Sequence, residues 1–135
     1  MRFVIVGCGK VGSRLVQELV GEGHEVTVIA RNPDAFRRLP PDFPAPLLVG
    51  TGSDEDVLER AGAREADALA AVTEDDNLNV MAAEVARLKF GVPNVIARVY
   101  DVELADFYRG QGIRTICPTS TVVAQVRDAL YEAPE

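Results

Sequence analysis

The sequence has little of several residue types that carry chemistry, with no tryptophan, two cysteines and one histidine in 135 residues. Its apolar runs are also short, at about five to seven residues, against the roughly 20 that a membrane-spanning helix needs. His24 falls in a predicted turn, so we expect a turn residue there rather than a general base. These absences argue against a membrane span and against histidine-based catalysis, and we expect a cytoplasmic domain.

The two cysteines are not expected to form a disulfide. Cys8 and Cys117 follow the first and sixth predicted strands, which in the strand order expected below lie three spacings apart, about 14 Å. A disulfide needs a much closer approach. Cys8 has two readings: a residue that meets a ligand through its backbone, or a reactive thiol whose pKa is lowered by a helix N-terminus.

Basic residues are fewer than acidic ones, 14 against 21, which gives a net charge of −7 at pH 7. That balance argues against a nucleic-acid partner held by phosphate neutralisation. A small anionic ligand needs only a local cluster of donors, which Lys10, Arg31 and Arg98 can supply at strand ends. Acids cluster at 54–56 and 74–76, where helices are expected to begin, so we read them as helix caps and predict no metal site.

Short β-branched runs alternate with amphipathic segments along the whole chain. This alternation predicts six βα units and a parallel sheet joined by right-handed crossovers. The fold class is therefore α/β, a single domain over 1–135 of the Rossmann type, with a doubly wound six-stranded sheet in the order 3-2-1-4-5-6. The predicted strands lie at 2–6, 26–29, 46–49, 68–72, 95–99 and 113–117.

Glycines and capping residues mark where helices begin and end. The first helix should end at 21–24, another should begin at 53–56, and a longer one should cover 76–90. The last should cover 119–131 and carries an apolar stripe that either covers a sheet edge or faces a second copy. The stripe consists of Val122, Val123, Val126 and Leu130.

A glycine fingerprint of the form G-x-G-x-x-G follows the first predicted strand directly, as Gly7-Cys8-Gly9-Lys10-Val11-Gly12. Gly7 permits a tight turn, Gly9 leaves room for a pyrophosphate, and Gly12 lets the helix lie close to the strand. The helix amides then face the phosphates. The placement predicts a dinucleotide or nucleotide site.

The end of the second predicted strand departs from NAD-binding domains. An acid usually holds the adenosine ribose there, roughly 20 residues past the glycines. This sequence has Ala30 followed by Arg31. Arg31 is read either as a contact to phosphate, in keeping with sites that accept a 2′-phosphate, or as a solvated strand-end residue.

Over nearly its whole length the chain resembles the N-terminal nucleotide-binding domain of potassium-uptake regulators, the TrkA-N or RCK family. The fingerprint carries part of the resemblance, and the segment Val72-Thr73-Glu74-Asp75-Asp76-Asn77-Leu78-Asn79 is its most specific part, since it fits the family pattern T-x-x-D-x-x-N. Further matches are Gly50-Thr51-Gly52, Val57-Leu58-Glu59-Arg60-Ala61-Gly62, Ala66-Asp67-Ala68 and Ile96-Ala97-Arg98-Val99.

The resemblance implies a non-catalytic cytoplasmic subunit that binds NAD(H), ATP, ADP or a related nucleotide and gates a separate membrane potassium transporter or channel. It implies a homodimer or larger assembly, peripheral to the inner face of the membrane through its partner. Carried over by position, Lys10 lies near the phosphates, Thr51 and Gly52 line the adenosine side, Thr73 forms the floor of the cleft, and Arg98 its rim. Asp76 and Asn79 should cap and pin the helix over 76–90.

Three departures leave alternatives open. Ala30 and Thr51 replace acids usual in the family, so NADP(H) and AMP join NAD(H), ADP and ATP as candidate ligands. The family's C-terminal RCK domain is absent from this sequence, which fits either a truncated chain or a stand-alone module. Two other functions compete with nucleotide sensing: an NADP-dependent oxidoreductase or its cofactor-binding half, and an assembly module without a ligand.

Overall fold

The structure, a computed structural model, describes residues 1–134, and its centre is a parallel sheet of six strands. The strand order β3-β2-β1-β4-β5-β6 confirms the predicted topology. All five neighbouring pairs run parallel. The four central strands are largely buried, and the two edge strands are more exposed. The strands are β1 (Arg2–Val6), β2 (Glu25–Ala30), β3 (Leu47–Val49), β4 (Ala68–Ala71), β5 (Asn94–Arg98) and β6 (Arg114–Ile116).

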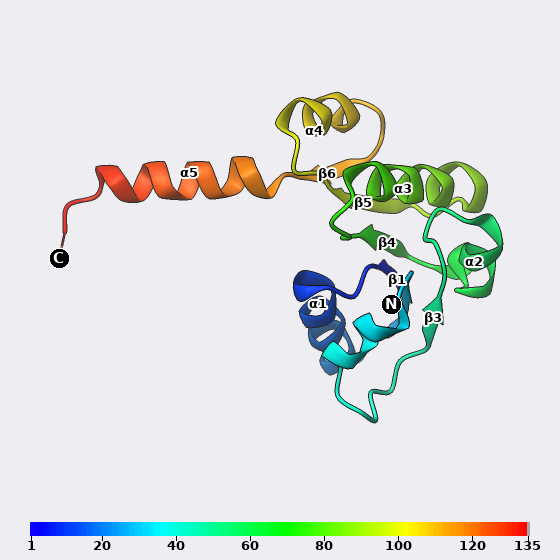
Figure 1. The fold of residues 1–135 in the computed structure, drawn as a ribbon. Coiled ribbons are helices and arrows are strands. Elements are labelled where there is room, and N and C mark those ends of the chain that lie inside the picture. The colour runs from blue at the N-terminus through cyan, green and yellow to red at the C-terminus, as the bar shows by residue number, and fades with distance from the viewer. Residues whose placement is uncertain (135) are drawn as a thin grey trace.

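Helices connect these strands and cover both faces of the sheet (Figure 1). Successive residues of β1 point to opposite faces, so Val4 and Val6 join one apolar cluster while Ile5 joins the other. The connecting helices are α1 (Lys10–Gly21), the 3-10 helix η1 (Pro33–Arg38), α2 (Glu55–Arg60), the 3-10 helix η2 (Ala63–Glu65), α3 (Asp76–Phe90) and α4 (Val102–Arg109).

Capping residues and glycines predicted from the sequence mark the ends of α2 and α3. Asp54 caps α2, which therefore begins at Glu55, and α3 covers the predicted range 76–90. It ends at Gly91, whose φ of +67° lies in the left-handed region that favours glycine.

The last helix, α5 (Pro118–Tyr131), extends away from the domain (Figure 1). No side chain along α5 is buried, and the predicted apolar stripe is open to solvent, with Val126 53% and Leu130 78% exposed. The alternative in which this helix covers its own sheet edge is therefore wrong for the isolated chain. No helix within residues 1–134 is long and apolar enough to cross a membrane.

An apolar groove of about 200 Å³ lies on the α1 side of the sheet, and we call it the bare groove. It is flanked by α1 and floored by β1, β4 and β5, which leaves apolar side chains of the sheet in contact with solvent. Its lining is Phe3, Ile5, Leu15, Leu19, Ala68, Ala70, Asn94 and Ile96.

Candidate functional site

A hollow of about 290 Å³ lies at the carboxyl ends of β1, β2 and β4, and we call it the switch-point cleft. The chain winds in opposite directions from β1, so β2 and β4 lie on either side of it, and this is where open α/β sheets bind ligands. The lining is Val6, Gly7, Cys8, Gly9, Ile29, Ala30, Arg31, Asn32, Ala35, Gly50, Gly52, Val72, Thr73, Glu74, Asp75 and Leu78.

The glycine turn between β1 and α1 forms one wall of the cleft. Gly7 has φ +109° and donates its amide to the carbonyl of Ile29 at 2.8 Å. A Cβ at Gly12 would collide with the carbonyl oxygen of Gly7, whereas a Cβ at Gly9 would meet open space. Each glycine therefore has the geometry expected of it, and the open side at Gly9 faces the cleft.

The N-terminus of α1 differs from those of α2, α3 and α4. In each of the latter an aspartate side chain accepts a backbone amide: Asp54 from Asp56, Asp75 from Leu78 and Asp101 from Leu104. At α1 the cap is Gly9, without a side-chain acceptor, and the first turn carries no acid. The first amides of α1 are therefore left for water or an anion.

On the side of the cleft formed by β2 and β3, several lining residues are alanine or glycine, and none of the described lining residues is an acid. Ala30 is buried at 7% exposure, and Arg31 beside it is exposed. Gly52 packs so closely on β1 that a Cβ there would collide with the side chain of Val6. Gly52 lines the cleft as expected, while the half-buried Thr51 does not.

Thr73 lies in the cleft wall after β4, and its polar groups are bound from behind by Asn79. The Thr73 hydroxyl donates to Asn79 Oδ1 at 2.6 Å, and Asn79 Nδ2 donates to the carbonyl of Thr73 at 2.9 Å. Asn79 is fully buried and also donates to the carbonyl of Arg98 at 2.8 Å. It therefore pins the helix, as expected, and joins the ends of β4 and β5.

Arg98 is placed differently from the expected rim position. Its side chain is only 7% exposed, and Nη2 donates to the carbonyl of Thr73 at 2.9 Å and lies 3.5 Å from a Glu74 carboxylate oxygen. Its Nε is buried without a hydrogen-bond partner among residues 1–134. Arg98 supports the loop after β4 from beneath and does not line the cleft.

Three further predicted residues, Lys10, Val11 and Gly12, also fall outside the cleft lining. Lys10 and Val11 begin α1 and are exposed, while Gly12 is buried against the turn. Lys10 forms no ion pair within the described chain.

Asp76 does not cap α3 as expected, because Asp75 occupies that position. The Asp76 carboxylate instead accepts the amides of Tyr100 at 2.9 Å and Asp101 at 3.0 Å. It thereby holds the loop between β5 and α4 beside the cleft.

Several cleft residues were not singled out in the sequence as ligand contacts. Glu74, Asp75, Asn32 and Gly50 all line it, and their common signal is a position in the first few residues after a strand. Cys8 also lines it and is 2% exposed. Burial raises the pKa of the Cys8 thiol and outweighs the opposing effect of the Arg38 charge, which favours the unreactive reading.

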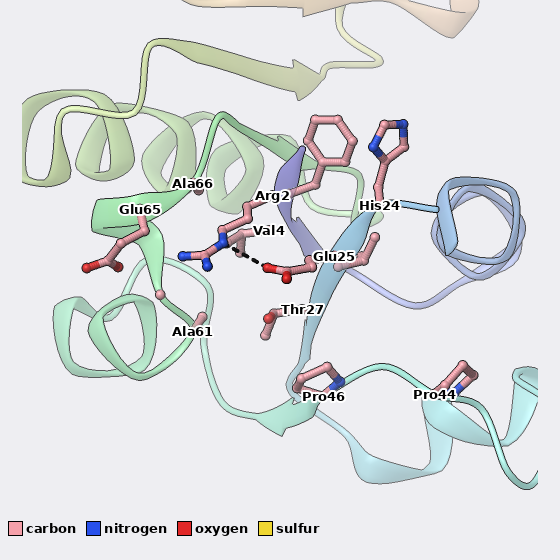
Figure 2. A pocket seen from close by; sticks show the side chains of 13 residues that line it. Arg2, Val4, His24, Glu25, Thr27, Pro44, Pro46, Ala61, Glu65 and Ala66 are labelled. Atoms are coloured by element: carbon pink, nitrogen blue, oxygen red, sulfur yellow. Dashed lines mark ion pairs between the residues drawn. The ribbon is translucent and has the colours of Figure 1, made fainter. Parts of the chain in front are cut away.

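The single histidine lies at the amino ends of β1 and β2, opposite the cleft, beside a second hollow of about 370 Å³ (Figure 2). His24 Nδ1 is 3.1 Å from the amino nitrogen of Met1, and its ring meets that of Phe3 edge-on at 5.0 Å. It is half-buried. Among the described residues, no group of three or more His, Cys, Asp or Glu side chains is arranged to hold a metal ion.

The fold and the cleft together define a Rossmann-type α/β domain with a cleft at its topological switch point. The family model for the TrkA-N domain matches residues 3–119. The chain therefore belongs to the TrkA-N domain family, which confirms the resemblance drawn from the sequence.

Relatives by sequence carry the name Trk system potassium uptake protein TrkA. The protein of Streptomyces coelicolor is 51% identical over 116 residues, which cover 86% of this chain and 52% of that protein. The protein of Vibrio alginolyticus is 40% identical over 103 residues, 76% of this chain and 22% of that protein. The chain thus spans about half or less of these relatives.

Solved structures of low sequence identity share the fold. The TrkA-N domain of the inner membrane protein ybaL from Escherichia coli has a TM-score of 0.84 at 20% identity, with 97% of this chain and 96% of that chain covered. The Kef CTD of Shewanella denitrificans, in its AMP-bound form, has a TM-score of 0.77 at 20% identity, with 98% and 84% covered. The GsuK channel bound to NAD has a TM-score of 0.71 at 21% identity, with 87% and 21% covered.

Proposed function

We propose that the chain is a nucleotide-sensing regulatory module of a potassium transport system, working in the cytoplasm at the inner face of the membrane. Its ligand is an adenine nucleotide or nicotinamide dinucleotide held in the switch-point cleft, and its membrane partner is a potassium transporter or channel subunit. The observation that carries this proposal is the α1 N-terminus, uncapped by any side chain in residues 1–134, behind the glycine turn. Relatives named for potassium uptake and fold neighbours bound to AMP or NAD support it.

A regulatory rather than catalytic role is favoured by where the polar side chains point. Thr73, one of the polar residues of the cleft lining, has its hydroxyl committed to Asn79. His24 lies at the opposite, amino ends of the strands, and burial raises the pKa of the Cys8 thiol, so it stays protonated at neutral pH. Hydride transfer needs a proton donor beside the cofactor. An NADP-dependent oxidoreductase would be supported instead by steady-state oxidation of NADPH with simple carbonyls.

Contacts behind the cleft give a route from ligand to assembly. Asp76, which follows the cleft residues of the β4 loop, holds the amide of Tyr100. The carbonyl of Tyr100 in turn accepts the Thr119 hydroxyl at 3.0 Å and the Cys117 thiol at 3.6 Å, at the base of α5. A ligand that moves the β4 loop therefore acts on α5, and binding would favour one arrangement of paired subunits over another.

The partner for α5 is a second copy of the chain, in a C2 homodimer. The stripe on α5 and the bare groove are both apolar and both uncovered in one copy. Burying the stripe removes apolar surface from water, and a two-fold arrangement covers the stripes of both copies at once.

Sedimentation across a concentration series tests the proposed dimer. Val126→Asp should give monomers, while Thr121→Asp, which adds the same charge to the opposite side of α5, should leave the dimer intact. A wild-type chain that remains monomeric contradicts it.

Nucleotide binding is tested by thermal unfolding and calorimetry with NAD⁺, NADH, NADP⁺, NADPH, AMP, ADP and ATP, with and without Mg²⁺. A ligand at 100 times its Kd adds about 2.7 kcal/mol, which should raise Tm by roughly 5–10 °C. The decisive variant is Gly9→Asp. Its Cβ meets open space, and aspartate is a good N-cap, so the variant should fold at least as well as wild type.

The same carboxylate fills and charges the phosphate position, so Gly9→Asp should abolish every nucleotide-induced shift. A variant that folds and still binds would contradict the proposed site. A wild-type chain that ignores all seven nucleotides would leave the assembly-module reading in its place.

A further inference from the structure

Resting on the proposed nucleotide function, we infer that the switch-point cleft selects adenine nucleotides carrying a phosphate on the 2′ oxygen of the ribose. NADP⁺ and NADPH are the common cellular members of this class. The inference is carried by the side of the cleft where β2 ends, at Ala30, Arg31 and Asn32.

Among residues 1–134, this side of the cleft presents no carboxylate that could accept hydrogen bonds from an unmodified ribose diol. A carboxylate there would accept the 2′ hydroxyl, but Ala30 offers a methyl group. The side-chain oxygen of Asn32 is already used, since it accepts the amide of Asp34 at 2.9 Å. The remaining described lining from β2 and from the loop after β3 is glycine and apolar side chains.

The same side has free donors. Arg31 lines the cleft and forms no ion pair or hydrogen bond with residues 1–134, whereas Arg37 on the same segment is paired with Asp34 at 3.5 Å. Because Asn32 uses its oxygen as a cap, its amide nitrogen remains available to donate. A guanidinium and an amide suit a phosphate, which accepts several charge-assisted hydrogen bonds.

The charges of the cleft are also divided between its two sides. Its carboxylates, Glu74 and Asp75, follow β4. On the other side Arg31 lines the cleft, and Arg38, outside the lining, is close enough for its charge to oppose the burial effect on the pKa of Cys8. A 2′-phosphate, with close to two negative charges at neutral pH, is favoured beside the arginines and away from the carboxylates.

The test uses ligand pairs that differ only in the 2′-phosphate: NADP⁺ against NAD⁺, and 2′,5′-ADP against 5′-AMP. Calorimetry at one fixed salt concentration should give at least about tenfold tighter binding for the phosphorylated member of each pair, in keeping with a charge-assisted contact. Equal binding, or tighter binding of NAD⁺ and AMP, overturns the inference while leaving the proposed function standing.

Variants then assign the preference to named residues. Arg31→Gln should remove most of the tenfold ratio by weakening NADP⁺ and leaving NAD⁺ unchanged, and Ala30→Asp should reverse the ratio in favour of NAD⁺. Arg37→Gln removes the same charge from the same segment outside the cleft and should keep the wild-type ratio. Arg31→Gln weakening both ligands equally overturns the assignment. Failure of every nucleotide to bind the wild-type chain overturns the proposed function and this inference together.

Discussion

The sheet carries two hollows at opposite ends of its strands, and the larger one is the less suited to a ligand. At the amino ends the donors of Arg2 already have partners: its side chain pairs with Glu25 at 2.8 Å (Figure 2), and its amide donates to Asp67. At the carboxyl ends, the first amides of α1 lack a side-chain acceptor in the described chain and Arg31 lacks a partner. Unsatisfied donors, more than volume, are therefore the reason for proposing the carboxyl-end hollow as the nucleotide site.

The largest effect is expected at the turn that shapes the carboxyl-end hollow. Gly12→Ala places a Cβ against the carbonyl oxygen of Gly7, and the buried backbone on both sides has little room to move. We expect a loss of about 3 kcal/mol or more in the free energy of unfolding, measured by urea denaturation. Gly21→Ala, on the same helix but facing open space, should be neutral or stabilise by up to about 1 kcal/mol. Equal effects at both positions would contradict the packing role of Gly12.

The second largest effect is expected at Asn79, whose hydrogen bonds join the ends of β4 and β5 behind the cleft. Asn79→Ala removes four hydrogen bonds and leaves the amide of Thr73 and the carbonyl of Arg98 without their partner. We expect a loss of about 2–4 kcal/mol, from unsatisfied buried groups, in thermal or urea unfolding. A matched change on the same helix, the exposed Met81→Ala, should cost far less. A loss under about 1 kcal/mol at Asn79 would mean that water replaces its contacts.

A smaller effect should appear only in alkali. Burial raises the pKa of the Cys8 thiol above its value in the unfolded chain. The folded state therefore keeps the proton longer, so its stabilising contribution is complete below the unfolded pKa and is lost as pH rises through the folded one. Unfolding across alkaline pH should show a steeper loss of stability in wild type than in Cys8→Ala. Parallel curves would show that the thiol does not titrate differently in the two states.

The smallest effect is expected at the amino-end hollow. Arg2→Gln breaks the ion pair with Glu25, but both side chains are more than half exposed. Water screens such pairs, so the loss should be about 0.2–1 kcal/mol. Nucleotide affinity should stay unchanged, which calorimetry can check. A variant that weakened nucleotide binding would remove the contrast between the two ends of the strands.

The sequence was most informative where a local pattern has one structural solution. Alternating apolar runs predict the parallel βα units of the sheet, and Gly7 and Gly12 predict the turn, because a positive φ and so close an approach both favour glycine. Distances between segments could not be read in this way. Arg98 was expected at the rim and lies buried beneath Thr73, because its depth depends on how β4 and β5 pack side by side.

Neighbouring acids posed a similar difficulty. Asp75 and Asp76 are the same residue type, so the sequence does not distinguish their roles. The geometry of the α3 N-terminus makes Asp75 the cap and leaves Asp76 to accept the amide of Tyr100. Likewise, the stripe on α5 was visible in the sequence, but its separation from the domain was not. Periodicity shows which residues share a helix face and says nothing of what covers that face.

The exposure of α5 has a consequence for its own backbone. An isolated helix shorter than about 12–15 residues is marginal in water, and α5 has 14 residues, none of which is buried. In the proposed dimer, its helicity then comes largely from the second copy that covers it. We expect the circular dichroism signal of the chain to weaken on dilution below the dimer dissociation constant, as α5 frays while the sheet stays folded. If helical signal is lost while the sheet stays folded, the helicity of α5 reports directly on whether the chain is assembled.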